Sequence, residues 1–287
     1  VKHSKILNMT TLLTTGCSYT KHSSPTWDLW LTPYFDKYVP LGKSGSGMRY
    51  SYIKIKDYFK YNKEIDPKNH TVIVQWSSLI RHDIRDIDHH WKCAGQIDNN
   101  PYFNKSYINN YYSLVDSTND FIHYVDSLIL LSKNLGFKLC MFYMFEPWLE
   151  DLLGEPCLHH QNIDKQILQW KKSKYYTSLS ETENSPYFLY PSIESHCLSN
   201  PTTKPIWDLN ANGKAFIDTH PTPLQHFSYS KLISTKLNLP FPSSVLQKIV
   251  EDVNNIMETK ELASKFIPKY NNEINDIDKL EKLIYTI

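Results

Sequence analysis

Residues 10–20, TTLLTTGCSYT, form a short apolar run that ends at a glycine and is followed at once by a serine. Such a run bounded by turn residues predicts a buried strand. Three later runs have the same form: YVPL at 38–41, HTVIVQW at 70–76 and FKLCMFYMF at 137–145. Segments with helical periodicity lie between them, at 48–62 and 117–136, and Gly136 is positioned to end the second helix. Strands that alternate with helices are typical of a parallel sheet covered by helices.

The domain organisation expected from this pattern is one α/β domain over residues 1–238 and a helical C-terminal extension over 239–287, behind the LPFP break. Two long segments with weak periodicity, 83–110 and 146–212, interrupt the α/β pattern and are interpreted as inserts. They are rich in Trp, Tyr, His, Asn and Pro, and we expect them to form a substrate wall.

Composition excludes several classes of partner. The formal net charge is +1 over 287 residues, which predicts no electrostatic binding to nucleic acid or to an anionic membrane surface. No apolar stretch approaches membrane-spanning length, and no cleavable signal peptide is visible. The five cysteines contain no CxxC pair, and their odd number argues against a complete disulfide framework. We therefore expect a cytoplasmic or virion-associated protein.

Three stretches beyond the first strand carry residues suited to chemistry. They are LGKSGSGMRY at 41–50, VIVQWSSLIRHD at 72–83 and FIDTHPTPLQHFSYS at 216–230. Parallel strands present their carboxyl ends at one edge of a sheet, so turns that follow four such strands would converge on one crevice. We expect Ser18 to meet the residues of these stretches there.

Serine is a weak nucleophile until an imidazole accepts its proton, and the imidazole needs a carboxylate to hold its tautomer. Backbone N–H groups must then stabilise the oxyanion of the tetrahedral intermediate. Ser18, His220, Asp218 and the amide of Gly45 fill these roles in order. Taken alone, Ser18 is more often a turn residue or a helix cap than a nucleophile, and Asp218 and His220 are compatible with a salt bridge in a loop.

These stretches resemble, in order, the four sequence blocks of the SGNH (GDSL-type) hydrolase family. GCSYT is similar to the first block, GKSGSG to the second, QWSS to the third and DTHP to the last. The resemblance implies a flavodoxin-like three-layer α/β/α fold and ester hydrolysis or acyl transfer on small esters, lipids or O-acetylated sugars. It implies an oxyanion hole formed by Ser18, Gly45 and Ser77.

The blocks depart from the family in three ways. Cys17 stands where the first block usually has Asp, and Ser77 stands where the third block has Asn. The last pair is Asp-x-His rather than Asp-x-x-His. This form is similar to that of sugar acetylation enzymes, so it makes acyl transfer a stronger alternative to hydrolysis. Asp208 is a reserve residue for orienting the imidazole.

Other residues are candidates for supporting roles, and each also has a structural interpretation. Arg81 can face the crevice or pair with Asp83 or Asp86. His226 can support the site or lie on the surface of a helix. Glycines at 42, 45 and 47 can serve turn geometry as well as the oxyanion. The possible supporting residues are Gly47, Ser78, Arg81, Asp208 and His226.

No cofactor or metal is expected. RHDIRDIDHHW at 81–91 and CLHH at 157–160 contain many ligand-type side chains but no zinc-protease or zinc-finger spacing. Neither a dinucleotide-binding glycine motif nor a P-loop lysine motif is present. An α/β-hydrolase elbow would need glycine at position 20, which is Thr20.

The function favoured by the sequence is a serine esterase or deacylase that cleaves a small acyl ester, with O-acetyl groups on carbohydrate as one substrate class. The alternatives are an O-acyltransferase of the same fold, or a catalytically impaired glycan-binding or structural subunit of a viral or surface assembly. The C-terminal helices are available for a protein partner or for self-association. An active enzyme must hold Ser18 Oγ near a His220 nitrogen, whereas a binding module need not.

Overall fold

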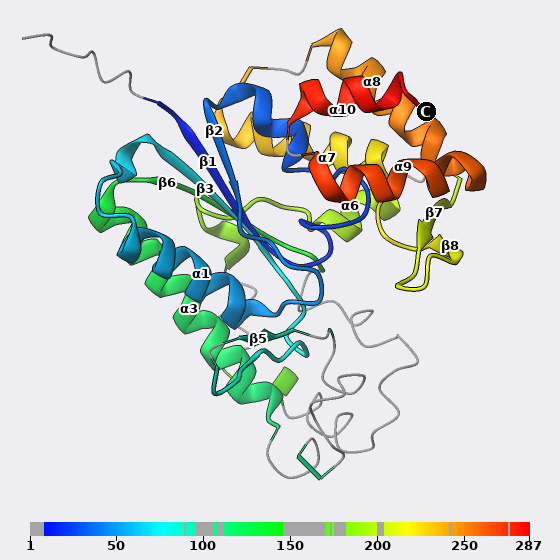
Figure 1. Cartoon of the computed structure of the whole chain (residues 1–287). Coiled ribbons are helices and arrows are strands. Elements are labelled where there is room, and N and C mark those ends of the chain that lie inside the picture. The colour runs from blue at the N-terminus through cyan, green and yellow to red at the C-terminus, as the bar shows by residue number, and fades with distance from the viewer. Residues whose placement is uncertain are drawn as a thin grey trace, which may run out of the picture.

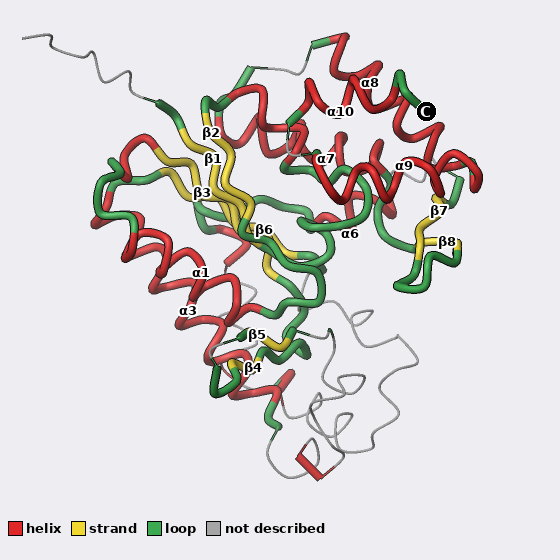
Figure 2. Tube along the Cα trace, in the orientation of Figure 1, coloured by secondary structure: helices red, strands yellow, loops and turns green. Residues whose placement is uncertain are grey.

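The computed structural model describes residues 9–88, 90–93, 95, 106–107, 112–145, 170–172, 174, 182–199, 204–240, 243–274 and 276–287. Its centre is a parallel sheet of four strands in the order β2-β1-β3-β6 (Figures 1 and 2). The strands are β1 (Thr11–Thr15), β2 (Lys37–Pro40), β3 (His70–Trp76) and β6 (Lys138–Tyr143). Each lies within or next to one of the four apolar runs of the sequence.

Helices cover both faces of this sheet. On one face α1 (Met48–Tyr61) and α3 (Leu114–Leu135) pack on side chains that include Leu13 and Val72 (Figure 1). On the other face the 3-10 helix η1 (Leu29–Tyr34) and the helices α6 (Ile193–Ser199) and α7 (Pro223–Leu237) surround Leu12 and Ile73. Neighbouring residues of β1 thus point to opposite faces, as strand geometry requires. The predicted three-layer α/β fold is confirmed.

Two helix ends show how the fold is stabilised locally. Gly136 ends α3 with φ of 83°, the left-handed conformation expected of it from the sequence. The first turn of α1 is capped from outside the helix, because the buried carboxylate of Asp83 accepts the N–H groups of Gly47 and Tyr50 at 2.7 and 2.8 Å. The cap ties the loop after β3 to the loop after β2.

The C-terminal extension forms α8 (Ser244–Glu258), α9 (Lys260–Glu273) and α10 (Ile277–Ile284). Their apolar faces enclose a core that includes Val253 and Phe266 and also takes in Trp30 of η1 and Phe227 of α7. Figure 1 shows these helices beside α7, on the side of the sheet away from α1 and α3. The extension therefore shares a hydrophobic core with the α/β domain.

Two antiparallel ribbons and two short 3-10 helices were not predicted. β4 (Ile84–Arg85) pairs with β5 (Trp91–Lys92), and β7 (Ile206–Leu209) pairs with β8 (Ala215–Asp218). The 3-10 helices are η2 (Pro67–Asn69) and η5 (Thr182–Asn184). Much of both inserts lies outside the described residues. Among the helices of the described ranges, none is both long and apolar enough to cross a membrane.

Candidate active site

Ser18 lies in the turn that follows β1, and this turn is held from the neighbouring strand. The buried amide of Gln75 presents Oε1 to the N–H of Cys17 at 3.0 Å and to Thr20 Oγ1 at 3.2 Å. The N–H groups of Thr20 and Lys21 both donate to the Cys17 carbonyl, at 3.0 and 2.9 Å, which closes a helical turn around the serine. A side chain at Gly16 would collide with both Thr20 and Gln75, so the strand can end here only in glycine.

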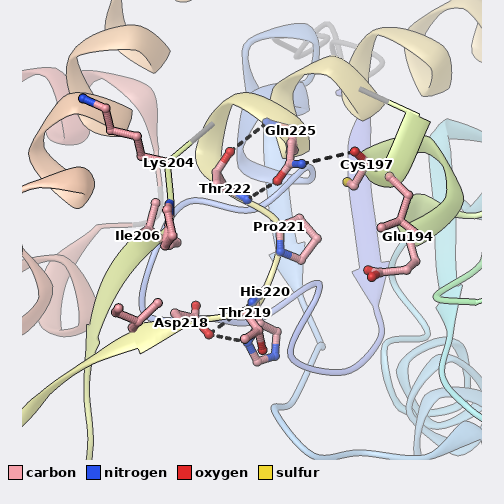
Figure 3. A pocket seen from close by; sticks show the side chains of 13 residues that line it. Glu194, Cys197, Lys204, Ile206, Asp218, Thr219, His220, Pro221, Thr222 and Gln225 are labelled. Carbon is pink, nitrogen blue, oxygen red and sulfur yellow. Dashed lines mark hydrogen bonds and ion pairs between the residues drawn. The ribbon is translucent and has the colours of Figure 1, made fainter. Parts of the chain in front are cut away.

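The hydroxyl of Ser18 faces the imidazole of His220. The distance between Ser18 Oγ and His220 Nε2 is 2.9 Å, and the distance between His220 Nδ1 and Asp218 Oδ1 is 2.7 Å. The backbone N–H of His220 also donates to Asp218 Oδ1, at 3.2 Å. Figure 3 shows the Asp218 carboxylate turned toward the His220 ring. Ser18, His220 and Asp218 thus form one hydrogen-bonded line across 202 residues of sequence.

The expected origin of the Asp218–His220 pair was wrong. The pair was predicted to follow a strand of the parallel sheet, but β8 is the second strand of the separate β7–β8 ribbon. Asp218 is the last residue of β8 and pairs with Ile206. The Thr222 capping box then begins α7 two residues after His220, so the imidazole lies on a short, held connection.

The environment of Asp218 favours its ionised form. Burial raises the pKa of this carboxyl, but hydrogen bonds from His220 and the nearby His22 and His220 imidazoles outweigh burial, and the net pKa lies below its ordinary value. An ionised carboxylate accepts the Nδ1 proton of His220. Nε2 is then free to accept the proton of Ser18.

A second histidine, His22, lies in the site and was missed by the sequence analysis. Its ring centroid is 4.3 Å from that of His220, and its Nε2 is 3.5 Å from Asp218 Oδ2 and 3.7 Å from Asp208 Oδ2. Asp208 therefore faces His22, and within the described residues its carboxylate makes no hydrogen bond or ion pair with His220. Nothing in the local sequence around His22 marks it, because the contact depends on the β7–β8 ribbon far along the chain.

His226 is buried, and the interpretation of it as a surface residue was wrong. It is 1% exposed and lies in α7, where its Nδ1 has no hydrogen-bond partner among the described residues. Burial lowers the pKa of His226 well below its ordinary value, and the neighbouring His22 and His220 lower it further. The ring is therefore neutral at neutral pH, and it packs beside Tyr19 with ring centroids 6.4 Å apart.

The candidate oxyanion residues Gly45 and Ser77 follow β2 and β3, the two strands that flank β1 in the sheet. Gly45 lies in the loop after β2 with φ of 76°, and Ser77 directly follows β3. Ser77 Oγ is buried and has no hydrogen-bond partner within the described part of the chain. The N–H of Gly47, in contrast, is occupied by the Asp83 carboxylate. Gly47 therefore serves the start of α1, while Gly45 and Ser77 remain candidates for the oxyanion hole.

Ser78 and Arg81 have structural contacts. Ser78 Oγ accepts the N–H of Ile80 at 3.4 Å, and its carbonyl accepts the N–H of Arg81 at 3.1 Å, so it stabilises the turn after β3. The Arg81 guanidinium donates to the Ser46 carbonyl at 3.5 Å. The two carboxylates considered as its partners are engaged elsewhere: Asp83 caps α1, and Asp86 lies 3.3 Å from Lys92.

A cavity of about 360 Å³ opens beside His220 (Figure 3). Its walls come from α6, the β7–β8 ribbon and the start of α7, and they include Ile206, Ile217, Cys197 and Glu194. Burial, and to a lesser degree Glu194, raises the pKa of the Cys197 thiol to about 12. Cys197 is therefore a thiol at neutral pH and a poor nucleophile. The hydroxyl that faces the His220 imidazole is that of Ser18.

Three side chains offer metal-ligand atoms within 4.8 Å of one another: His22, Asp218 and His220. Asp218 Oδ1 and His220 Nδ1 are already joined by a 2.7 Å hydrogen bond, so a cation bound through these two atoms would displace the proton that orients the imidazole. Of the His and Asp residues considered for metal binding in the sequence, His89 and residues 157–160 lie outside the described residues. Asp86 accepts the N–H of His90 at 2.7 Å.

Comparison of the sequence with models of known protein families and with curated proteins finds no match. The function is therefore inferred from the geometry of the site.

Proposed function

We propose that this protein is a serine hydrolase of small acyl esters, with Ser18 as nucleophile, His220 as general base and Asp218 as the residue that orients His220. The observation that carries the proposal is the line from Ser18 Oγ through His220 to Asp218, with distances of 2.9 and 2.7 Å. Both lie within hydrogen-bond reach. This line also favours an enzyme over a binding module, which has no need of it.

In the proposed reaction Ser18 Oγ attacks the ester carbonyl carbon while its proton moves to His220 Nε2. The resulting imidazolium is stabilised by the Asp218 carboxylate at Nδ1. His220 then returns the proton to the leaving alcohol, and the acyl group stays on Ser18. Water, activated by His220 in the same way, releases the acid and restores the hydroxyl.

The tetrahedral intermediate carries a negative charge on the former carbonyl oxygen. The backbone N–H groups of Ser18 and Gly45 and the hydroxyl of Ser77 are the proposed donors to it. The absence of a hydrogen-bond partner for the buried Ser77 Oγ within the described ranges supports this assignment, because a buried hydroxyl is usually paired. The resemblance of the four sequence blocks to the SGNH hydrolases supports the same set of donors.

The size of the cavity beside His220 is consistent with a small substrate. Apolar side chains such as Ile206 and Ile217 share its wall with Glu194 and Lys204, so it suits a ligand with both apolar and polar parts. An O-acetylated sugar has this character. The Asp-x-His spacing keeps transfer of the acyl group to an acceptor hydroxyl as the second candidate.

Hydrolysis of p-nitrophenyl acetate and butyrate by the purified wild type tests the proposal, with Ser18→Ala and His220→Ala alongside. We expect turnover by the wild type and loss of it in both variants. If the folded wild type hydrolyses neither ester, or if all three proteins are equally active, the proposal is contradicted for this substrate class. Ser264→Ala is the control, because Ser264 lies on α9 and its hydroxyl donates to the Lys260 carbonyl of the same helix.

Addition of an acceptor sugar separates the two candidate reactions. A hydrolase releases acid at a rate that the sugar does not change. A transferase produces the acylated sugar at the expense of free acid, and mass spectrometry of the products distinguishes the two.

A further inference from the structure

His22 lies in the loop that carries Ser18 and contacts residues of the β7–β8 ribbon far along the chain. It lies four residues beyond Ser18, its side chain is only 9% exposed, and its ring is tilted by 38° against the ring of His220. The hydrolytic steps proposed above do not use it. A buried imidazole in contact with a catalytic base requires a physical explanation.

The Nε2 atom of His22 faces two carboxylates. Asp208 and Asp218 lie on one face of the β7–β8 ribbon, since Asp218 pairs with Ile206, two residues before Asp208. In each carboxylate Oδ1 is already engaged: that of Asp218 by His220, and that of Asp208 by the N–H of Leu209 at 2.7 Å. The two Oδ2 atoms are the ones near His22 Nε2, at 3.5 and 3.7 Å.

His22 lies next to an oxygen of Asp218, Oδ2, that otherwise has no hydrogen-bond donor in the described part of the chain. Among the described residues Asp218 Oδ2 is buried and has no hydrogen-bond partner of its own. A carboxylate held only at Oδ1 can turn about its last bond and weaken the hydrogen bond to His220. A donor at Oδ2 opposes that rotation, and contacts of this kind are often long before the substrate binds.

The surroundings of His22 Nδ1 favour the tautomer that carries its proton on Nε2. Nδ1 lies 3.2 Å from Ser23 Oγ and 3.4 Å from Ser24 Oγ, and either hydroxyl can donate to it. Burial, followed by repulsion from His220, lowers the pKa of His22, while Asp218 and Asp208 oppose the shift. A neutral ring that accepts at Nδ1 carries its proton on Nε2 and points it at the two carboxylates.

We propose that His22 is a positioning residue: its Nε2–H holds Asp218 Oδ2 so that Oδ1 stays on His220 Nδ1. The inference rests on the proposed function for its effect on rate. It concerns the alignment of Asp218 and His220, and His22 itself does not touch the reacting atoms.

Three substitutions of His22 distinguish hydrogen-bond donation to Asp218 from simple packing of the side chain. In His22→Gln the amide nitrogen can reach the place of Nε2, in His22→Asn it reaches only the place of Nδ1, and His22→Leu has no donor. We expect kcat of the Gln variant to stay within about threefold of the wild type and that of the Asn and Leu variants to fall about ten- to hundredfold, with KM unchanged. His70→Leu is the control, a buried histidine at the start of β3, away from the site, whose loss should leave kcat unchanged.

Wild-type kcat in His22→Leu overturns the inference. Equal loss in the Gln and Leu variants overturns it too, because the position of the donor would then not matter.

A second readout does not depend on catalysis. Proton NMR should show a downfield imidazole resonance from the Nδ1–H of His220, identified by its absence from His220→Ala. We expect it to persist in His22→Gln and to shift upfield or broaden in His22→Leu. Should no ester be hydrolysed while the resonance responds to His22 in this way, the proposed function fails and the positioning role stands. If the enzyme is active and the resonance is unchanged in His22→Leu, the positioning role alone is overturned. If the wild type shows no such resonance, the Asp218–His220 hydrogen bond is contradicted, and with it both proposals.

Discussion

The Oε1 atom of Gln75 accepts a 3.0 Å hydrogen bond from the backbone N–H of Cys17, the residue before the candidate nucleophile. The same oxygen accepts from Thr20 Oγ1, and the Gln75 amide nitrogen donates to the carbonyl of Trp76. One fully buried side chain thus connects the end of β3 to the turn that carries Ser18. The position of the candidate nucleophile therefore depends on a residue that takes no part in the proposed reaction.

Replacement of Gln75 by leucine should therefore reduce both stability and activity. It leaves the Cys17 N–H and the Thr20 hydroxyl buried without a partner, which costs about 1–3 kcal/mol of unfolding free energy. Urea denaturation measures that loss, and ester hydrolysis measures the effect on kcat. Thr15→Val is a suitable control, since Thr15 Oγ1 is buried on β1 without a hydrogen-bond partner in the described ranges. A Gln75→Leu protein with wild-type stability would contradict the role given to this amide.

Removal of the hydroxyl in Ser77→Ala should lower kcat without lowering stability. Because Ser77 Oγ has no hydrogen-bond partner in the described part of the protein, its removal leaves no group unpaired in the free enzyme. Loss of an oxyanion donor should reduce kcat about a hundredfold with little change in KM. Steady-state kinetics and thermal unfolding test both halves of this prediction.

Ser234→Ala is the matched control for Ser77→Ala. Ser234 Oγ is likewise buried and without a hydrogen-bond partner in the part of the chain described, but it belongs to the last turns of α7. Its loss should leave kcat unchanged. If Ser77→Ala behaves in the same way, Ser77 is not part of the oxyanion hole.

The Asp83 cap of α1 predicts a cost in stability for its removal. Asp83→Ala deprives the N–H groups of Gly47 and Tyr50 of their acceptor and removes a negative charge from the positive end of a helix. We expect a loss of about 1–2 kcal/mol in unfolding free energy and a smaller loss for Asp83→Asn, which keeps one acceptor oxygen. Chemical denaturation distinguishes these values. Equal stability of all three proteins would show that the cap is not needed.

Burial of neutral His226 predicts a loss of stability in acid. Its folded pKa lies well below the unfolded value of 6.5, so above that pH both states are neutral and stability does not change on its account. Below pH 6.5 the unfolded chain binds a proton that the native protein does not, and the unfolding free energy falls. His226→Phe should reduce the drop in melting temperature between about pH 7.5 and about pH 5.5.

His22, His70, His82 and His196 also have pKa values lowered by burial. The drop in melting temperature should therefore become smaller in His226→Phe without disappearing. An unchanged drop would mean that His226 is protonated in the native state.

The sheet could be predicted from the sequence because each strand carries its own local signal. HTVIVQW is rich in β-branched residues and forms β3 over His70–Trp76, and the glycine after α3 has the left-handed conformation that its position suggested. Ser18 and His220 were also identified before their contact was known. Chemistry-bearing residues that directly follow apolar runs are visible locally.

The places of His22, Asp83 and His226 depend on tertiary contacts that leave no local pattern. His22 is a single histidine in a loop, and only the β7–β8 ribbon brings Asp208 and Asp218 to it. Asp83 belongs to a charged stretch that is compatible with a surface ion pair, yet it is buried as a helix cap. His226 lies on a helix of weak amphipathicity, so burial could not be inferred from its position. In each case the deciding partner is far away in the sequence.

Whether Ser18 is an activated nucleophile is tested most directly by covalent labelling with a fluorophosphonate and mass spectrometry of the digested protein. An activated serine reacts with this reagent, whereas an ordinary serine does not. We expect a single adduct on Ser18 in the wild type, no adduct in Ser18→Ala, and labelling slowed at least about a hundredfold in His220→Ala. An adduct on another residue, or equal labelling of Ser18 in the wild type and in His220→Ala, would contradict the assignment of Ser18 as the activated nucleophile.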